Sequence, residues 1–237
     1  MRRPWIAALF STALAWSTPV DAGDRYLVEP PDVEQSLAFR YAARGDDDCL
    51  AELRARGVPF ERADPTRGVD TPIRFSGPIR GVTFRPTYRA QPDDKAITTI
   101  ADCRLGLAID DLAAVLARNG VVEAQYMSMY RTRGLGWIKP RMRHPGGRAI
   151  DLAAVKLADG TSYNVRWDFH PRGGATCGDK ASKPFKDTPG ARLWRSVVCE
   201  LGDKRSFNLI LTPHYDWGHR DHLHMEVRSG IRWFLIH

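Results

Sequence analysis

Two stretches that lie far apart in the chain are rich in histidine and aspartate, and they constrain the fold more than any other feature. Residues 144–151 read HPGGRAID, and residues 218–227 read GHRDHLHMEV. A catalytic zinc ion takes three protein ligands, mostly from His, Asp and Glu, and keeps a further position open for water. We therefore predict that the fold brings the two stretches together into one zinc site, and that the rest of the chain is its scaffold.

The local sequence favours metal ligands over isolated polar groups. His222 and His224 are two positions apart on a predicted strand and so face the same side, where two buried histidines are costly unless something binds them. Asp151 lies in an apolar run and needs a partner, which a cation would supply. The glycines after His144 allow the tight backbone path that the two ends of this stretch need to converge. The helical His-Glu-x-x-His pattern of zincins is absent, so another architecture is expected.

The N-terminus has the layout of a secretory signal peptide. Arg2 and Arg3 precede a mostly apolar run over residues 5–16, and small residues at 20–22 offer a cleavage site after Ala22. The run is shorter than the ~20 residues of a spanning helix, which argues against the alternative of a membrane anchor. We assign residues 1–22 to a signal peptide and expect a periplasmic or secreted protein with no integral membrane span after cleavage.

The formal net charge of +7 suits an anionic neighbourhood such as a cell envelope. Nucleic acid is the other usual partner of a basic chain, and charge alone does not choose between the two. We favour an envelope partner and expect no nucleic acid.

Four cysteines in an exported chain indicate disulfides, for which three pairings are possible. We favour Cys49–Cys103 and Cys177–Cys199, which join neighbouring segments. No Cys-x-x-Cys motif occurs, which disfavours a cysteine zinc cluster or a redox motif.

The order of predicted elements indicates an α+β fold. Residues 23–95 are expected to form an N-terminal arm and extension tied on by a disulfide, with 23–48 as a flexible arm, and residues 96–237 to form the domain that carries the zinc site. Asp102 is expected to cap a core helix, and Gly202 to end a second one. The predicted helices are 49–56, 104–119 and 189–201, and the predicted strands are 69–74, 81–85, 121–130, 149–155, 162–167, 207–212 and 221–228.

Two signatures carry a resemblance to known zinc peptidases. HPGGRAID at 144–151, followed by DHLH at 221–224, resembles the zinc signature of the D-alanyl-D-alanine carboxypeptidase and dipeptidase families, which share a fold with lysostaphin-type peptidases and the hedgehog signalling domain. Over most of the mature chain the sequence is similar to bacterial extensin-like C-terminal domain proteins, through DCRL at 102–105, SMYR at 128–131 and LTP at 211–213. The resemblance implies a hedgehog/DD-peptidase-like fold, with a central antiparallel sheet flanked by helices.

The resemblance also implies ligands and catalytic groups. His144, Asp151 and His224 correspond to the ligands of one zinc ion per chain. Asp221 holds the position of the carboxypeptidases' general base, although those families more often have Glu there.

A second pattern leaves the identity of the base open. His219, His222 and His224 match the His-x-x-His-x-His spacing of penicillin-insensitive murein endopeptidases, so His219 competes with Asp221 for the proton. His222 could hydrogen-bond the intermediate or orient the water, and Arg131 matches an arginine that contacts the substrate and stabilises the oxyanion.

These expectations describe an exported zinc metallopeptidase that resembles D,D-carboxypeptidases and endopeptidases and hydrolyses peptide bonds of peptidoglycan, at D-Ala or at cross-links. The alternative is a non-catalytic, zinc-stabilised cell-envelope binding module, as the hedgehog domain illustrates for this fold. His214 and Asp216 are expected to be loop residues near the rim of the site. Core packing is expected for each of Trp137, Trp167 and Trp217, in preference to a place on the wall of a cleft.

Overall fold

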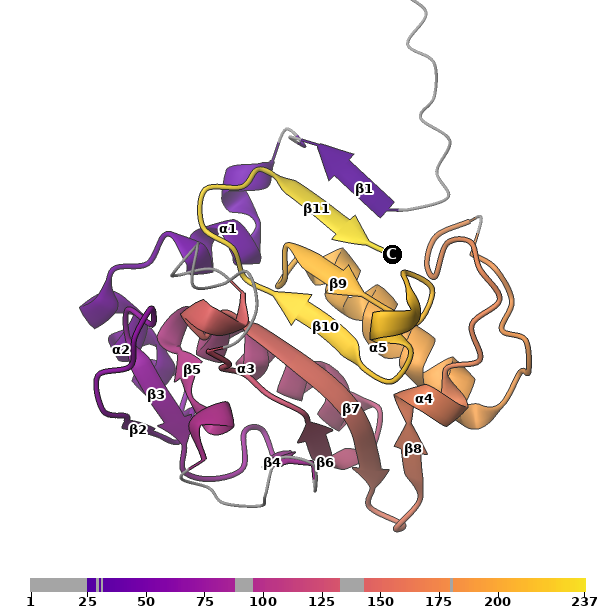
Figure 1. Cartoon of the computed structure of the whole chain (residues 1–237), viewed down its shortest axis with the longest axis horizontal. Coiled ribbons are helices and arrows are strands. Elements are labelled where there is room, and N and C mark those ends of the chain that lie inside the picture. The colour runs from indigo at the N-terminus through magenta and orange to yellow at the C-terminus, as the bar shows by residue number, and fades with distance from the viewer. Residues whose placement is uncertain (1–24, 29, 31, 88–95, 133–142, 180) are drawn as a thin grey trace, which may run out of the picture.

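The chain forms a mixed α+β structure around one large sheet (Figure 1). The computed structural model describes residues 25–28, 30, 32–87, 96–132, 143–179 and 181–237, so the predicted signal peptide and Trp137 lie outside the described residues. The strand order is β1-β11-β9-β10-β7-β6-β4, and β8 pairs with β7. The strands are β1 (Arg25–Val28), β4 (Thr83–Pro86), β6 (Val121–Tyr126), β7 (Ala149–Leu157), β8 (Ser162–Asn164), β9 (Leu209–Leu211), β10 (Leu223–Glu226) and β11 (Trp233–Ile236).

The main sheet is mixed, whereas the resemblance implies an antiparallel one. β4 runs parallel to β6, and β11 runs parallel to β9, while the other neighbours are antiparallel. A second, three-stranded antiparallel sheet consists of β2 (Phe60–Arg62), β3 (Pro72–Phe75) and β5 (Ala101–Asp102).

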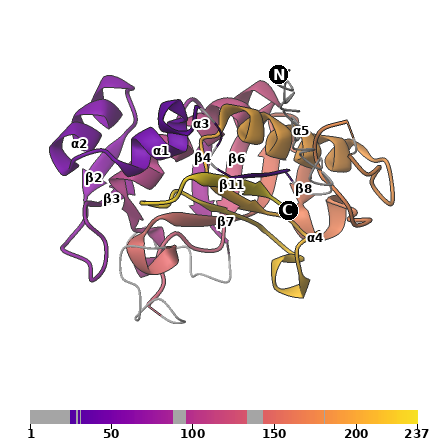
Figure 2. The same cartoon turned by 90° about the horizontal axis from the view of Figure 1, so that it is seen from above.

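The longer helices lie on one side of the main sheet (Figure 2). On the other side, the short turns η4 and η5 project from the sheet, as the same view shows. The helices are α1 (Leu37–Ala42), α2 (Asp46–Ala55), α3 (Cys103–Arg118), α4 (Val165–Asp168) and α5 (Pro189–Lys204), and the 3-10 turns are η1 (Val33–Gln35), η2 (Ile97–Thr99), η4 (His144–Gly146) and η5 (Trp217–His219). Among the described residues, none of these helices combines the length and the apolar character that crossing a membrane requires.

Helix α3 is the centre of the core, as its sequence predicts. Asp102 caps it by accepting a hydrogen bond from the backbone N–H of Arg104 at 3.0 Å. Leu105, Ile109 and Leu112 are fully buried, together with most of the helix. An N-cap carboxylate satisfies a backbone donor that the helix cannot, which contributes about 1 kcal/mol to stability.

Helix α5 continues past its predicted stop. It begins with Pro189 in its first turn, as expected, but runs through Gly202 to Lys204. Arg205 ends it in the left-handed conformation, at φ 51°. A glycine within three residues of a helix end is tolerated inside the last turn when another residue takes the left-handed position.

The described part of residues 23–48 is not a flexible arm. It contains β1, α1 and the start of α2, and β1 pairs with β11 near the C-terminus. Val33 and Ala38 are buried against Phe234, which gives the segment an apolar contact that a solvated arm lacks.

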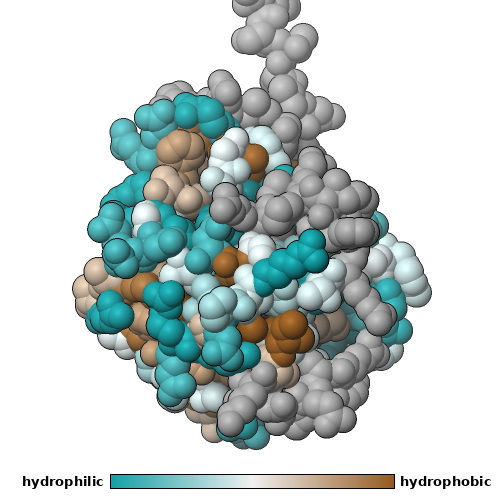
Figure 3. Space-filling model, turned by 60° about the vertical axis from the view of Figure 1, so that its left-hand side comes forward, coloured by the Kyte–Doolittle hydropathy of each residue, from teal (hydrophilic) through white to brown (hydrophobic). Residues whose placement is uncertain are grey.

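The face that Figure 3 shows is mostly hydrophilic where it is not grey, with hydrophobic residues only in small, separate patches.

Both expected disulfides are present. Cys49 of α2 is bonded to Cys103 at the start of α3, and Cys177 is bonded to Cys199 of α5. The first bond ties the N-terminal helices to α3, as the sequence predicts for residues 23–95.

Candidate metal centre

The pairing of β7 with β10 brings the two histidine-rich stretches together. The two strands are antiparallel neighbours, and their register places His224 directly opposite Asp151. Directly opposed residues in an antiparallel pair project their side chains from the same face, about 5 Å apart. Each of these residues lies between apolar neighbours that face the core, such as Leu152 and Leu223. The strands that build the core therefore also position two of the three predicted ligands.

A tight turn brings His144 to the same point. His144 begins η4, and Gly147 ends it in the left-handed region, at φ 63°. The backbone N–H of Asp102 donates to the carbonyl of Gly147 at 2.8 Å, and a Cβ at Gly147 would lie only 2.7 Å from that nitrogen. The position therefore requires glycine for two reasons, its conformation and its close contact, as the sequence pattern indicated.

Three imidazole nitrogens converge on one carboxylate oxygen. Oδ1 of Asp151 lies 2.7 Å from Nδ1 of His224, 3.0 Å from Nε2 of His144 and 3.5 Å from Nε2 of His222. The Asp151 side chain is only 2% exposed. The ligand atoms of His144, Asp151 and His224 all lie within 4.8 Å of one another, which is the spacing of a ligand set around one ion. His219, His222 and His224 form a second such group that shares His224.

The electrostatics of the buried groups follow from their mutual contacts. Burial by itself would raise the pKa of the Asp151 carboxyl, but the facing imidazoles of His144 and His224 outweigh it and hold this pKa well below its ordinary value. Burial lowers the pKa of His144, against the opposing attraction of Asp151. Burial also disfavours charge on His224, yet its two carboxylate neighbours raise its pKa to about 9.

Glu226 is the second of these neighbours, and it was not among the predicted site residues. Its Oε1 lies 2.6 Å from Nε2 of His224, and its side chain is fully buried. Arg143 and Arg228 lie 3.3 and 3.5 Å from its carboxylate oxygens. A carboxylate on the outer nitrogen of a metal-binding histidine fixes the ring and its tautomer. The signal was in the sequence, because Glu226 follows His224 by two residues on the same strand face.

Two more histidines stand beside the cluster, and each is paired with an aspartate. Nδ1 of His219 lies 2.7 Å from Oδ1 of Asp216, which also accepts the backbone N–H of His219. Nδ1 of His222 lies 3.0 Å from Oδ1 of Asp221. Asp216 was expected to be only a rim residue, yet it orients His219.

The environment of His219 disfavours a charged ring. Burial lowers the pKa of His219, against the attraction of Asp216, so its ring is neutral at neutral pH. Its ring centre lies 5.7 Å from that of His224 and 5.2 Å from that of His222. Asp221 reaches the cluster through His222, to which its carboxylate is hydrogen-bonded. Which group takes a proton stays a prediction.

Arg131 lies at the mouth of the cluster. Its guanidinium is 2.9 Å from Oδ2 of Asp151, the oxygen that does not face the histidines, and its side chain is 49% exposed. The hydroxyl of Ser128 is 3.5 Å from the same oxygen. Arg131 is thus anchored by a predicted ligand, Asp151, and its side chain is open to solvent, as a contact with substrate would require.

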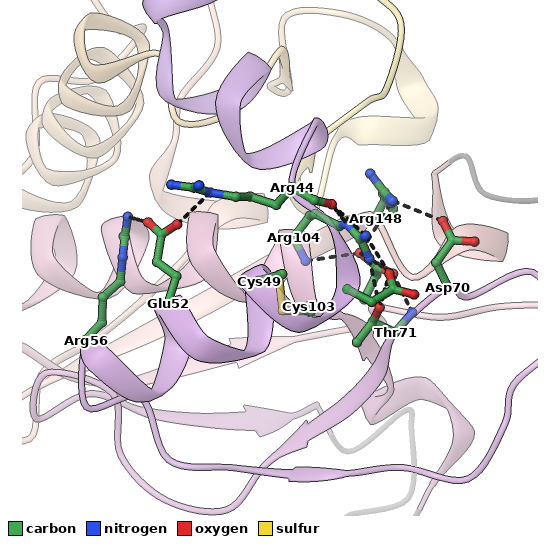
Figure 4. The surroundings of a disulfide bond; sticks show 11 residues. Arg44, Cys49, Glu52, Arg56, Asp70, Thr71, Cys103, Arg104 and Arg148 are labelled. Atoms are coloured by element: carbon green, nitrogen blue, oxygen red, sulfur yellow. Dashed lines mark hydrogen bonds and ion pairs between the residues drawn. A yellow bond between two sulfur atoms is a disulfide. The ribbon is translucent and has the colours of Figure 1, made fainter.

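Polar contacts of Arg148 fix the turn at η4 to the neighbouring segments. Arg148 pairs with Asp70 at 3.1 Å (Figure 4). It also pairs with Asp102, at 3.4 Å. The carbonyl of Arg148 accepts the backbone N–H of Val227, the residue after β10. The Cys49–Cys103 disulfide lies beside these contacts, as Figure 4 also shows. The buried turn is therefore fixed to β10 on one side and to the start of α3 on the other.

A comparison with known protein families identifies the chain's relatives. The family described as "Extensin-like protein C-terminus" matches residues 47–234, which include both histidine-rich stretches. The chain belongs to this extensin-like family. This confirms the extensin-like part of the resemblance, while the relationship to zinc peptidases remains a prediction for this extensin-like protein. No curated protein and no solved structure matches the chain at a significant level.

Proposed function

We propose that this extensin-like protein is an exported zinc-dependent peptidase that hydrolyses peptide bonds of peptidoglycan, at D-Ala or at cross-links. We also propose that its α+β structure is of the hedgehog/DD-peptidase type. The observation that carries the proposal is the convergence of three imidazole nitrogens on Oδ1 of Asp151, at 2.7–3.5 Å, in a buried cluster with Arg131 at its mouth.

The donor set suits zinc. His144, Asp151 and His224 offer two imidazole nitrogens and one carboxylate, the mixture that zinc accepts and that magnesium and calcium do not prefer. Nδ1 of His224 faces the other two ligands, while Nε2 faces Glu226, so one nitrogen can bind the ion and the other can donate to a carboxylate. An ion bound there also removes the cost of packing these polar groups in the core.

The residues around the cluster provide the groups that a peptidase needs. Zinc would act as a Lewis acid that activates water and polarises the scissile carbonyl. His219, held through Nδ1 by Asp216, accepts the proton at Nε2 and later delivers it to the leaving amine. Asp221 acts through His222, which it orients toward Asp151. Arg131 binds the substrate carbonyl or carboxylate and stabilises negative charge in the transition state.

Location and substrate follow from the charge and the N-terminal sequence. The chain carries a formal net charge of +7, which complements the anionic polymer of a cell wall. A signal peptide over residues 1–22 would deliver it to the periplasm or outside the cell.

Metal analysis and digestion of peptidoglycan test the proposal together. We expect about one zinc ion per mature chain and its loss in His144→Ala. The matched control is His170→Asn, because His170 lies outside the cluster and asparagine tolerates its left-handed backbone, at φ 49°. Mass spectrometry of purified peptidoglycan incubated with the zinc-loaded protein should show new peptide fragments with wild type and His170→Asn only. Zinc binding without any released peptide would favour the non-catalytic binding module, and absence of zinc would refute the site.

A further inference from the structure

Four aromatic side chains are exposed in the described part of the chain, and they come from two neighbouring segments. Trp167 is 66% and Phe185 71% exposed in one segment, and Tyr215 is 45% and Trp217 77% exposed in the other. The expectation that Trp167 and Trp217 pack in the core is therefore wrong. Burial of an aromatic side chain removes about 150–250 Å² of its surface from water, which is favourable. A ligand that covers the two exposed tryptophans would gain this free energy on binding.

Trp217 lies in the loop beside the candidate metal centre, and Trp167 lies on a helix near the same loop. Trp217 belongs to η5 and is two residues before His219, and the ring of Tyr215 contacts that of His219 with centres 5.3 Å apart. Figures 1 and 2 show α4, which carries Trp167, near the loop that contains η5. The segment after α4 contacts this loop through His214, whose ring lies 5.3 Å from Phe169.

Each tryptophan is paired with an arginine. The guanidinium carbon of Arg220 lies 4.6 Å from the ring centre of Trp217, and Arg220 also donates to the carbonyl of Trp217. The guanidinium carbon of Arg166 lies 4.7 Å from the ring centre of Trp167. In such a cation–π contact the guanidinium group covers one face of the indole ring and places positive charge next to it. The high exposure of both rings leaves their remaining surface open to a ligand.

We propose that Trp167 and Trp217 form a stacking surface for the glycan strand of peptidoglycan beside the metal centre. The apolar C–H faces of pyranose rings stack on indole, and the adjacent guanidinium groups of Arg166 and Arg220 can donate to sugar hydroxyls or to carboxylates of an anionic glycan. The choice of this glycan rests on the proposed function. The surface would hold the polymer while a peptide attached to it enters the cluster.

A membrane surface is the other partner that tryptophan and arginine together could suggest. The observations favour a polymer of sugars. Polar residues separate the exposed aromatic residues along each segment, such as Asp216 between Tyr215 and Trp217, and this pattern does not favour insertion of one apolar face. One of them, Tyr215, also contacts the ring of His219, where a substrate and not a lipid is expected.

The test measures binding to glycan strands from which an amidase has removed the stem peptides, so that no cleavable peptide remains. Isothermal titration with the full mature chain should show binding by wild type. Trp217→Ala and Trp167→Ala should each weaken it by about tenfold, the effect of truncating one aromatic contact in an interface. The matched control is Trp233→Ala, because Trp233 also stacks under an arginine, with Arg228 at 5.4 Å. Trp233 lies on β11, outside the proposed surface. It is four residues, or about 13 Å, before His237, the residue that contacts Tyr215.

Two further arms separate this inference from the proposed function. His144→Ala should bind the glycan as wild type does, because the stacking surface does not need the ion. Glycan binding that depends on the two tryptophans, in a protein that releases no peptide, would refute the peptidase and retain the stacking surface. Unchanged affinity in both tryptophan variants, loss of affinity only in His144→Ala, or tryptophan-dependent binding to anionic phospholipid vesicles in place of the glycan would overturn the inference.

Discussion

Zinc and protons should compete for His224, and the competition can be measured. Nδ1 of His224 lies 2.7 Å from Asp151 and Nε2 lies 2.6 Å from Glu226. Both neighbours are carboxylates that only accept hydrogen bonds, so the ring satisfies both of them when it carries two protons. Their attraction outweighs the effect of burial and raises the pKa of His224 to about 9. A zinc ion that binds Nδ1 must displace one of these protons.

The size of the effect follows from the difference between this pKa and the pH. A pH of 7 is about two units below the pKa of His224, so protonation of the ring should weaken zinc binding by about 100-fold, or about 2.7 kcal/mol. A histidine with the ordinary pKa of about 6.5 would weaken it by less than about twofold at that pH. Burial lowers the pKa of His144, and Asp151 is already ionised, so neither adds a proton near neutrality.

Calorimetric titration with zinc in buffers of different ionisation enthalpy counts the protons. We expect about one proton released per zinc at pH 7, and an apparent affinity that rises about tenfold per pH unit between pH 6 and 8. Glu226→Gln removes one of the two charges that hold the proton, so its proton count at pH 7.5 should fall and its pH slope should flatten. Glu61→Gln, on an exposed residue of β2, is the control. Zinc binding without proton release at pH 7 would refute this account of His224.

Three further predictions concern stability, measured by urea denaturation. Because the pKa of His224 is raised in the folded chain, the metal-free protein should keep this contribution below pH 6.5 and lose roughly 3 kcal/mol as pH rises through 9; a flat profile in chelator would contradict it. Gly147→Ala should destabilise by about 2–4 kcal/mol, because it adds left-handed strain and a Cβ 2.7 Å from the backbone nitrogen of Asp102; zinc should be lost with it, and wild-type stability would disprove the close contact. The double change Cys49→Ala and Cys103→Ala, which opens a loop with a sequence separation of 54, should cost about 4 kcal/mol; a loss below about 1 kcal/mol would show that chain entropy is not the main contribution.

The sequence predicted the elements near the candidate site best, because their signals are local. The capping of α3 by Asp102 depends on residues within one turn of the helix. His222 lies just before β10 and not on it as predicted, but its ring and that of His224 both reach Asp151, as period two predicts. The turn at Gly147 is a local backbone constraint, which is why glycine could be interpreted before any contact was known.

The elements that the sequence missed depend on contacts between distant segments. β1 exists because it pairs with β11, from the other end of the described chain, and neither strand is longer than four residues. Strands this short carry little periodicity, so only the partner stabilises them. The exposed tryptophans were misjudged for a related reason, since a tryptophan in isolation is usually buried and only the surrounding fold shows that Trp167 and Trp217 are not.

The three proposed ligands depend on the fold to different degrees. Asp151 and His224 are opposed across two central strands, so any change that preserves the β7–β10 register preserves their spacing. His144 reaches them only through the η4 turn, which Arg148 ties to Asp102 at 3.4 Å. Asp102 in turn caps α3, next to the disulfide that joins it to the N-terminal helices. The position of His144 is therefore coupled to a part of the chain that contributes no ligand, whereas its two partners are fixed by the sheet. The N-terminal helices consequently support the turn that completes the proposed ligand set.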